Sequence, residues 1–273
     1  MLDKLDELIE EIKNLSKTEY YQIKITKETP EIFDSKIGGL PYWSEEKNYP
    51  TNSEGKKLFL LAQINFEREK VKSPLPTNGI LQFFINNDIL MGVDYKNPTK
   101  QNNFRVIYHD KINYNINKDS IKKLDIPSTE KVYYYPVYGE YKISLNKNIE
   151  YVNYHDIKFD KFFSEAYKKV FKKALKEENY CYFKVLNIQE RDEINKELKL
   201  KGINHKMLGY SYFTQEDPRY NKKYIDYDTL LLQIDSEAKF VMWGDVGIGN
   251  FFIPKKSLIE KDFSNVLYNW DCS

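Results

Sequence analysis

A short segment near the start of the chain recurs near its end, and this internal repeat is the feature that most constrains the fold. Residues 35–46 read SKIGGLPYWSEE, and residues 205–216 read HKMLGYSYFTQE. At one constant spacing, four residues of the first segment return in the second: Lys36, Gly39, Tyr42 and Glu46 recur as Lys206, Gly209, Tyr212 and Glu216.

Two further blocks repeat in the same order. LLAQIN at 60–65 recurs at the same spacing as LLLQID at 230–235, and GILQFFI at 79–85 recurs two residues out of step as GIGNFFI at 247–253. Matched blocks in one order are hard to obtain by chance. They predict two related halves, 35–86 and 205–253, that form one compact unit.

Length and composition are consistent with one large domain. The chain has 273 residues, of which 41% are hydrophobic and 15% aromatic, so it can bury a substantial core. Such a chain could also form two small domains, but no low-complexity linker divides it. We therefore expect a single domain over 1–273.

The charge balance argues against a nucleic-acid partner, and the lack of a long apolar run argues against a membrane-spanning segment. The chain carries 42 Lys and Arg against 41 Asp and Glu, whereas a nucleic-acid-binding domain is usually basic. The N-terminal residues lack the basic start and apolar run of a signal peptide, and no stretch approaches the roughly 18 apolar residues that span a bilayer. We expect a cytoplasmic protein without a nucleic-acid or membrane partner.

Three segments have the apolar periodicity of amphipathic helices. The first is 2–17, whose apolar residues recur at helical spacing between Asp, Glu and Lys. The second is 160–179, and the third is 188–202, with Gly202 as its C-cap. A short helix at 119–125, capped by Asp119 or Ser120, completes the prediction.

Alternating or continuously apolar segments predict strands, which outnumber the helices. Short turns separate many of them, which is typical of antiparallel pairing. The fold class we expect is α+β, with largely antiparallel sheets and flanking helices. The predicted strands are 20–28, 57–66, 80–86, 91–95, 103–109, 130–145, 228–235, 239–245, 248–253 and 265–272.

The repeated motifs resemble those of a known family. SKIGGLPYW, LFLLAQINF, GILQFFI and MWGDVGIGNFFI together are similar to the YwqG-like family of bacterial proteins, a family of unknown function. The resemblance covers roughly residues 20–272 and implies a compact, sheet-rich α+β unit. It carries over no catalytic residues. Because some relatives lie near secreted-toxin genes, it implies that toxin neutralisation is conceivable.

Gln63 and Gln233 occupy matched positions inside apolar strands. A buried amide without a hydrogen bond costs about 1–3 kcal/mol, so each must have partners. They either belong to a polar network that determines the sheet register, which is the commoner role of such groups, or they contact a ligand in a groove between the halves.

Aromatic residues of the repeat are the other candidates for binding. Large aromatic side chains in a concave patch are the usual anchors of protein recognition, but they also fill cores. The turn Trp243-Gly244-Asp245 has the same two interpretations: a local hairpin, or a Trp platform with an acidic contact. Under the binding interpretation, we expect a groove between the halves that is lined by Tyr42, Trp43, Tyr212, Phe213 and Trp243, with Gln63, Gln233 and Asp245 as polar contacts.

No recognisable catalytic or metal site accompanies these residues. His109, His155 and His205 show no metal-ligand spacing, and the two Cys, Cys181 and Cys272, lie in unrelated contexts. Tyr-His-Asp occurs twice, but neighbouring residues of a strand point to opposite faces. We expect no cofactor and no catalytic residue.

These observations favour a non-catalytic binding or interaction protein with another protein as its partner, and the family resemblance implies toxin neutralisation as one form of that role. Two alternatives stay open: a sensor of a small ligand, and an enzyme with an unrecognised carboxylate and histidine site. The oligomeric state is not predicted.

Overall fold

The computed structural model describes residues 4–44, 47–126, 133–176, 182–198 and 204–273. Several sequence predictions fall partly outside these ranges: the start of the first helix, Glu46 of the repeat, Cys181, and the ends of the helices predicted at 160–179 and 188–202. The described part is an α+β structure with one ten-stranded antiparallel sheet and six α-helices.

The strands are β1 Thr18–Ile25, β2 Lys36–Gly38, β3 Phe59–Asn65, β4 Ile80–Ile85, β5 Phe104–His109, β6 Glu140–Glu150, β7 Lys206–Leu208, β8 Thr229–Asp235, β9 Ile248–Ile253 and β10 Leu267–Asp271. The helices are α1 Leu5–Ser16, α2 Lys118–Lys122, α3 Phe159–Phe171, α4 Tyr182–Val185, α5 Ile188–Leu198 and α6 Lys255–Ile259, with 3₁₀ turns η3 Pro218–Tyr220 and η4 Lys222–Tyr224.

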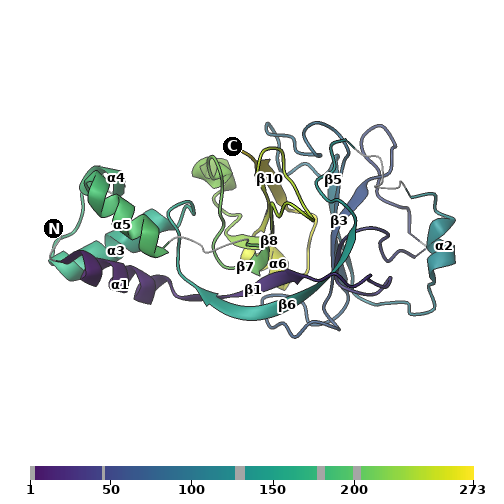
Figure 1. Ribbon diagram of the computed structural model, residues 1–273, viewed down its shortest axis with the longest axis horizontal. Helices are drawn as coiled ribbons and strands as arrows, with labels where there is room; N and C mark the ends of the chain where they lie inside the picture. The colour runs from purple at the N-terminus through teal and green to yellow at the C-terminus, as the bar shows by residue number, and fades with distance from the viewer. Residues whose placement is uncertain (1–3, 45–46, 127–132, 177–181, 199–203) are drawn as a thin grey trace.

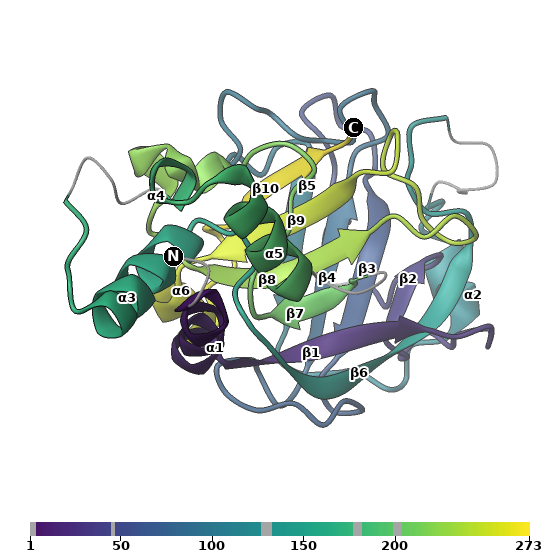
Figure 2. The same ribbon diagram turned by 60° about the vertical axis from the view of Figure 1, so that its left-hand side comes forward.

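The long strands β1 and β6 form the middle of the sheet. Its strand order is β10-β9-β8-β7-β1-β6-β2-β3-β4-β5, so four strands lie on each side of the central pair. β1 pairs with β6 from Thr18 opposite Glu150 to Ile25 opposite Ile143. β1 and β6 run along the base of the sheet, and the two outer groups of strands rise from them (Figures 1 and 2).

The sheet folds over so that its two outer groups face each other across the main hydrophobic core. Phe83 of β4 lies 5.0 Å from Phe251 of β9, and Phe104 of β5 lies 5.2 Å from Tyr268 of β10, between ring centroids. These side chains belong to one buried cluster that spans both groups of strands. The space between the outer strands is therefore filled by core side chains.

The loop that contains Pro98 and Gln101 forms hydrogen bonds with both edge strands, β5 and β10, or with residues next to them. The backbone N–H of Tyr268 in β10 donates to the carbonyl of Pro98, and the Gln101 side chain donates to the carbonyls of Phe263 and Ser264. The side-chain oxygen of Gln101 also accepts the backbone N–H of Val106 in β5. These hydrogen bonds satisfy backbone groups of the edge strands that could otherwise pair with another chain.

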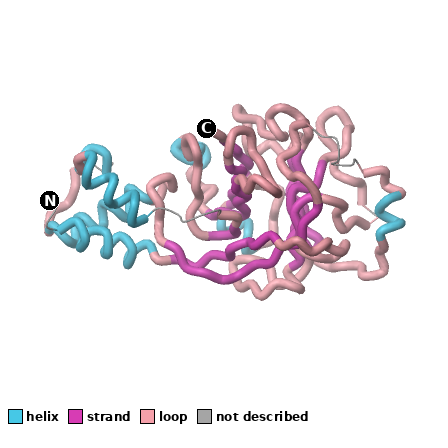
Figure 3. Tube along the Cα trace, in the orientation of Figure 1, coloured by secondary structure: helices cyan, strands magenta, loops and turns pink. Residues whose placement is uncertain are grey.

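Four helices form a separate layer beyond one end of β1 and β6 (Figures 1 and 3). α1 packs on α3 and α5. Its buried residues Leu5, Leu8, Ile9 and Ile12 follow the predicted helical spacing and join a second core with Phe159 and Phe163. No helix in the described ranges is long and apolar enough to cross a membrane.

Three predicted elements differ from the structure. The helix predicted at 160–179 ends at Phe171, because Lys172 adopts a left-handed backbone conformation with φ 54°. The strand predicted at 130–145 is wrong over 133–139, since β6 begins at Glu140, after Pro136, and residues 130–132 lie outside the described ranges. The strand predicted at 239–245 is replaced by isolated bridges at Val241.

Two smaller predictions are also wrong. Residues 91–95 form turns and no strand. The short helix α2 is capped by Asn117, whose side chain accepts the N–H groups of Asp119 and Ser120, and not by either of those residues.

Candidate functional site

The two repeated glutamines occupy equivalent polar clusters. The Gln63 side-chain oxygen accepts the backbone N–H of Tyr42 at 2.8 Å, and that of Gln233 accepts the backbone N–H of Tyr212 at 2.8 Å. The amide nitrogens donate to loop carbonyls, Ile32 and Asp34 for Gln63 and Asn204 for Gln233. Both side chains are fully buried. Each glutamine therefore ties the preceding loop to its strand.

The neighbouring strand contributes one more amide side chain to each cluster, Gln82 from β4 and Asn250 from β9, and the two differ in their number of hydrogen bonds. Gln82 donates to Gln63 at 2.8 Å and to the Tyr42 carbonyl at 2.7 Å, and its own oxygen lies 2.9 Å from His109 Nε2. In the second cluster Asn250 donates to the Tyr212 carbonyl at 2.9 Å, and within the described part of the chain its side-chain oxygen has no partner. Asn is shorter than Gln by one methylene, which accounts for the missing contacts.

Two buried lysines lie at the matched repeat positions. Lys36 Nζ contacts Glu140 at 2.8 Å, and Lys206 Nζ contacts Glu150 at 2.7 Å; both acids come from the central strand β6. Burial lowers the pKa of both lysines. The repeat contained these lysines, but composition alone does not distinguish a buried lysine from an exposed one.

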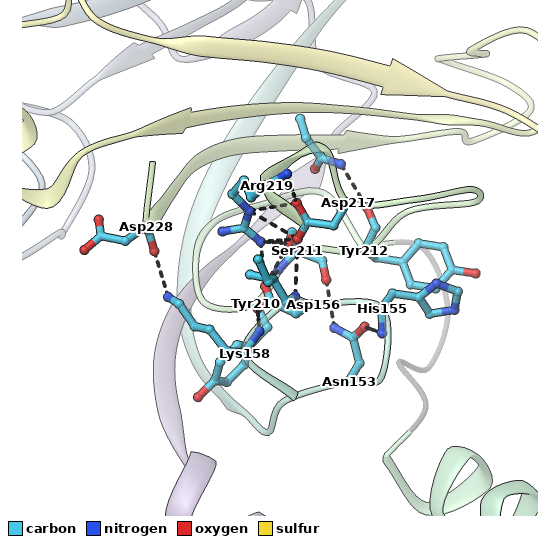
Figure 4. A network of polar contacts seen from close by, with 12 residues as sticks. Asn153, His155, Asp156, Lys158, Tyr210, Ser211, Tyr212, Asp217, Arg219 and Asp228 are labelled. Atoms are coloured by element: carbon cyan, nitrogen blue, oxygen red, sulfur yellow. Dashed lines mark hydrogen bonds and ion pairs between the residues drawn. The ribbon is translucent and has the colours of Figure 1, made fainter. Parts of the chain in front are cut away.

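A second polar network joins the loop between β6 and α3 to the segment between β7 and β8 (Figure 4). Arg219 contacts Asp217 at 2.6 Å and Asp156 at 3.2 Å, and Asp156 accepts the N–H and hydroxyl of Ser211 at 2.8 Å. Burial alone would raise the pKa of Asp156, but the Arg219 guanidinium holds it below its usual value. All four side chains are buried and bonded to one another, so this network stabilises the loops that it joins.

The predicted aromatic contacts do not meet on one surface. Tyr42 and Trp43 pack under α2 and the adjoining loops on the outer face of β3 and β4. Phe213 covers the outer face of β8 and β9, and Trp243 lies in the main core between the sheet halves. All four are 2% exposed or less, whereas Tyr212 is partly exposed and Asp245 is exposed. Their binding role stays a prediction.

In two of the three histidines, ring nitrogens form hydrogen bonds with neighbouring residues. His205 Nδ1 accepts the backbone N–H of Asp235 at 3.0 Å, while its Nε2 lies 3.1 Å from Glu237. His109 donates to Gln82, and burial lowers its pKa to about 4. His155 differs: its Nε2 is buried without a hydrogen-bond partner among the described residues, and its ring lies 4.4 Å from that of Tyr212.

A cleft of about 620 Å³ lies where the helical layer, the central strands and the second half of the sheet meet. Leu208, Gly209 and Ile149 form part of its wall, and none of the eight predicted contact residues lines it. Its full lining is Lys17, Thr18, Glu19, Tyr21, Ser73, Pro74, Ile149, Lys158, Leu208, Gly209, Asp228, Thr229, Leu230 and Lys255.

Tight backbone packing shapes the wall of the cleft at Gly209. This residue has φ 76°, and a Cβ there would lie 1.8 Å from the Glu150 carboxylate that pairs with Lys206. Glycine is the residue that accepts both conditions. Gly209 belongs to the sequence repeat, which was the one available signal for this site; the other lining residues are scattered along the chain and become neighbours through topology.

In the described ranges, no three His, Cys, Asp or Glu side chains are grouped so that they could hold a metal ion. No curated protein matches the chain. The model of a family described as a domain of unknown function (DUF1963) matches residues 35–272. Because this match covers most of the chain, the protein belongs to that family.

Proposed function

We propose that this chain is a non-catalytic binding protein and that the cleft between the helical layer and the sheet is its binding site. The observation that carries the proposal is the cleft itself, because 620 Å³ lies within the range of pockets that hold small molecules. Such pockets often occur where structural layers meet, and this one is lined by segments from both halves of the chain.

The histidines favour binding over acid–base catalysis. A general base needs a ring nitrogen within reach of the substrate. In His205 both nitrogens already have partners, and His109 is 2% exposed and bonded to Gln82. His155 does not line the cleft. The enzyme alternative therefore has less support than binding.

The proposal is tested by a variant that fills the cleft. Ile149 is 49% exposed and lines it, so Ile149→Trp should occupy part of its volume while leaving the buried face of β6 unchanged. Protein purified from its own cells is analysed by native mass spectrometry for small molecules that stay bound. We expect a ligand on the natural protein and its loss from Ile149→Trp.

The matched control is Ile225→Trp, which adds the same side chain at a position 52% exposed and outside the cleft. It should retain the ligand. Equal retention by both variants would refute the cleft as the binding site.

We also propose that the segments 35–86 and 205–253 are related halves of one unit. Three matched details support this: the bonds of Gln63 and Gln233, the positive φ of Gly39 and Gly209, and a β-bulge at equivalent places of β3 and β8. If the halves are related, a residue of one half should fit the equivalent position of the other. Asn250→Gln is the direct test.

A protein partner is the second candidate, supported by one exposed end of the sheet. Val246 is 59% exposed beside Asp245, whose carboxylate forms no ion pair with any described residue. Affinity purification with mass spectrometry tests it. A partner lost from a Val246→Glu/Asp245→Ala variant would support this surface, and a partner retained by that variant would contradict it.

The proposal also includes the origin and location of the protein and one specific role. The motifs that resemble the YwqG-like family support a bacterial, cytoplasmic protein, and toxin neutralisation would be one form of the protein-binding alternative. Cell fractionation of the source organism tests the location. Protection of cells from a toxin encoded nearby tests the last role.

A further inference from the structure

Three lysine side chains from distant parts of the chain line the cleft. Lys17 follows α1, Lys158 precedes α3, and Lys255 opens α6, so the fold brings them together from distant parts of the chain. None of the three forms an ion pair with a described residue, although many other lysines of the protein do. Lys158 Nζ donates to the Asp228 carbonyl at 2.7 Å, and no hydrogen bond of the described residues involves Nζ of Lys17 or Lys255.

The acidic groups of the cleft offset these lysines only in part. Glu19 is paired with Lys147 at 2.6 Å. One oxygen of the Asp228 carboxylate accepts the backbone N–H of Lys255 at 2.9 Å and the Thr229 hydroxyl at 2.9 Å, which leaves its second oxygen as the remaining acceptor. The cleft therefore holds more positive than negative charge in a chain that is otherwise balanced.

A structural role does not explain all of these charges. Lys158 is the N-cap residue of α3, a position where anionic groups stabilise a helix and cations do not. Lys17 and Lys255 are exposed, and neither forms an ion pair with a described residue. A ligand that carries anionic oxygens would supply the missing charge.

We propose that the ligand of the cleft is a small organic molecule with a phosphate or carboxylate group, an inference that rests on the proposed function. Lys17, Lys158 and Lys255 bind the anionic group, and the Thr18 and Ser73 hydroxyls lie in the same lining as further donors. Ile149, Leu208 and Pro74 supply an apolar wall for the rest of the molecule. Hydrogen bonds between ammonium groups and such oxygens are among the stronger ones in proteins.

The test measures binding of charged and neutral probes by isothermal titration calorimetry on the full chain. AMP and glucose 6-phosphate carry phosphate, citrate carries carboxylates, and adenosine and glucose are the neutral counterparts. We expect at least one anionic probe to bind, its neutral counterpart to bind at least tenfold more weakly, and the affinity to fall as sodium chloride increases. If phosphate and carboxylate probes differ, the group is thereby identified.

Variants connect this binding to the lysines. Lys17→Gln/Lys255→Gln should lower the affinity about tenfold or more, since one charge-assisted contact is worth about that factor. The matched control is Lys256→Gln, because Lys256 is the neighbour of Lys255 on α6, is mostly exposed and does not line the cleft. Circular dichroism confirms that each variant is folded.

Three results would overturn the ligand class. The first is an affinity unchanged in the double variant, and the second is no binding by any anionic probe at about 10 mM, where simple charge contacts are already measurable. Equal binding of adenosine and AMP that Ile149→Trp abolishes would also overturn it, while leaving the cleft as the binding site. Anion binding that Ile149→Trp leaves unchanged would refute the cleft and, with it, the proposed function.

Discussion

At the scale of single residues, the main finding is that buried polar side chains organise the loops on the outer faces of the sheet. Gln63 and Gln233 were predicted to be hydrogen-bonded because they lie in apolar strands, and both are. Their partners are backbone groups of distant loops, which the sequence does not identify. Between the two interpretations offered for them, these bonds support the structural one.

The unequal pair Gln82 and Asn250 leads to the first prediction. Asn250→Gln should extend the side chain to the Gln233 oxygen, as Gln82 reaches Gln63, and should stabilise the protein by about 1 kcal/mol, the usual net contribution of a hydrogen bond. The measurement is the urea midpoint at neutral pH. The reciprocal variant Gln82→Asn should lose about 1–3 kcal/mol, because a buried donor and acceptor lose partners. A destabilised Asn250→Gln would contradict the equivalence of the two clusters.

His109 leads to a prediction about pH. Burial lowers its pKa to about 4, below the usual value near 6.5, so the unfolded chain binds more protons between those limits. The contribution of His109 to the free energy of unfolding is therefore fully present above pH ~6.5. It is lost as the pH decreases toward 4, with a slope of about 1.4 kcal/mol per pH unit.

The measurement for His109 is the free energy of unfolding at pH 7 and pH 5. His109→Gln, which keeps a donor for Gln82, should reduce the dependence on pH. His155, whose pKa burial also lowers to about 4, should leave a residual slope in that variant. An unchanged slope in His109→Gln would contradict the assignment.

At the scale of elements, the turn after β7 decides the shape of the cleft wall. Gly209→Ala would place a Cβ 1.8 Å from the Glu150 carboxylate and 3.0 Å from Tyr20, at φ 76°. The expected loss is about 3 kcal/mol or more, because backbone strain is added to the breaking of a buried ion pair. Thermal unfolding measures it.

Gly55→Ala is the control for the turn. Gly55 has φ 80°, but its Cβ would meet nothing within 4 Å, so only the backbone strain of about 1 kcal/mol remains. Equal losses in both variants would show that the contact with Glu150 does not matter.

Elements were predicted best where one pattern is sufficient to form them. The spacing of Leu5, Leu8 and Ile12 determines α1, and the continuous apolar runs determine β3, β4, β8 and β9. The predictions failed where a local signal competes with a weak pattern, as at Lys172 and before Glu140. A left-handed residue or a proline ends an element regardless of the residues around it.

At the scale of the whole molecule, the N-terminal residues are central although the family match begins at residue 35. β1 lies between β6 and β7 and is the strand that joins the two sides of the sheet. Removing residues 1–34 should therefore abolish cooperative folding, since β6 and β7 would lose their partner and the main core would be exposed.

The control for this truncation removes residues 1–16, which deletes α1 but keeps β1. This shorter deletion should unsettle the helical core of Phe163 and Ile194 while the sheet stays folded. Near-ultraviolet circular dichroism and amide exchange distinguish the two outcomes. A folded sheet after removal of residues 1–34 would contradict the central role of β1.

The sequence by itself determined the fold class, the main strands, the first helix and the matched residues of the repeat, because these depend on periodicity and on identity at equivalent positions. Only the tertiary structure decided that Tyr42, Trp43 and Trp243 are buried, that the sheet closes around one core, and that Lys17, Lys158 and Lys255 share a cleft. Burial and proximity depend on how distant segments pack, and local patterns carry no information about that.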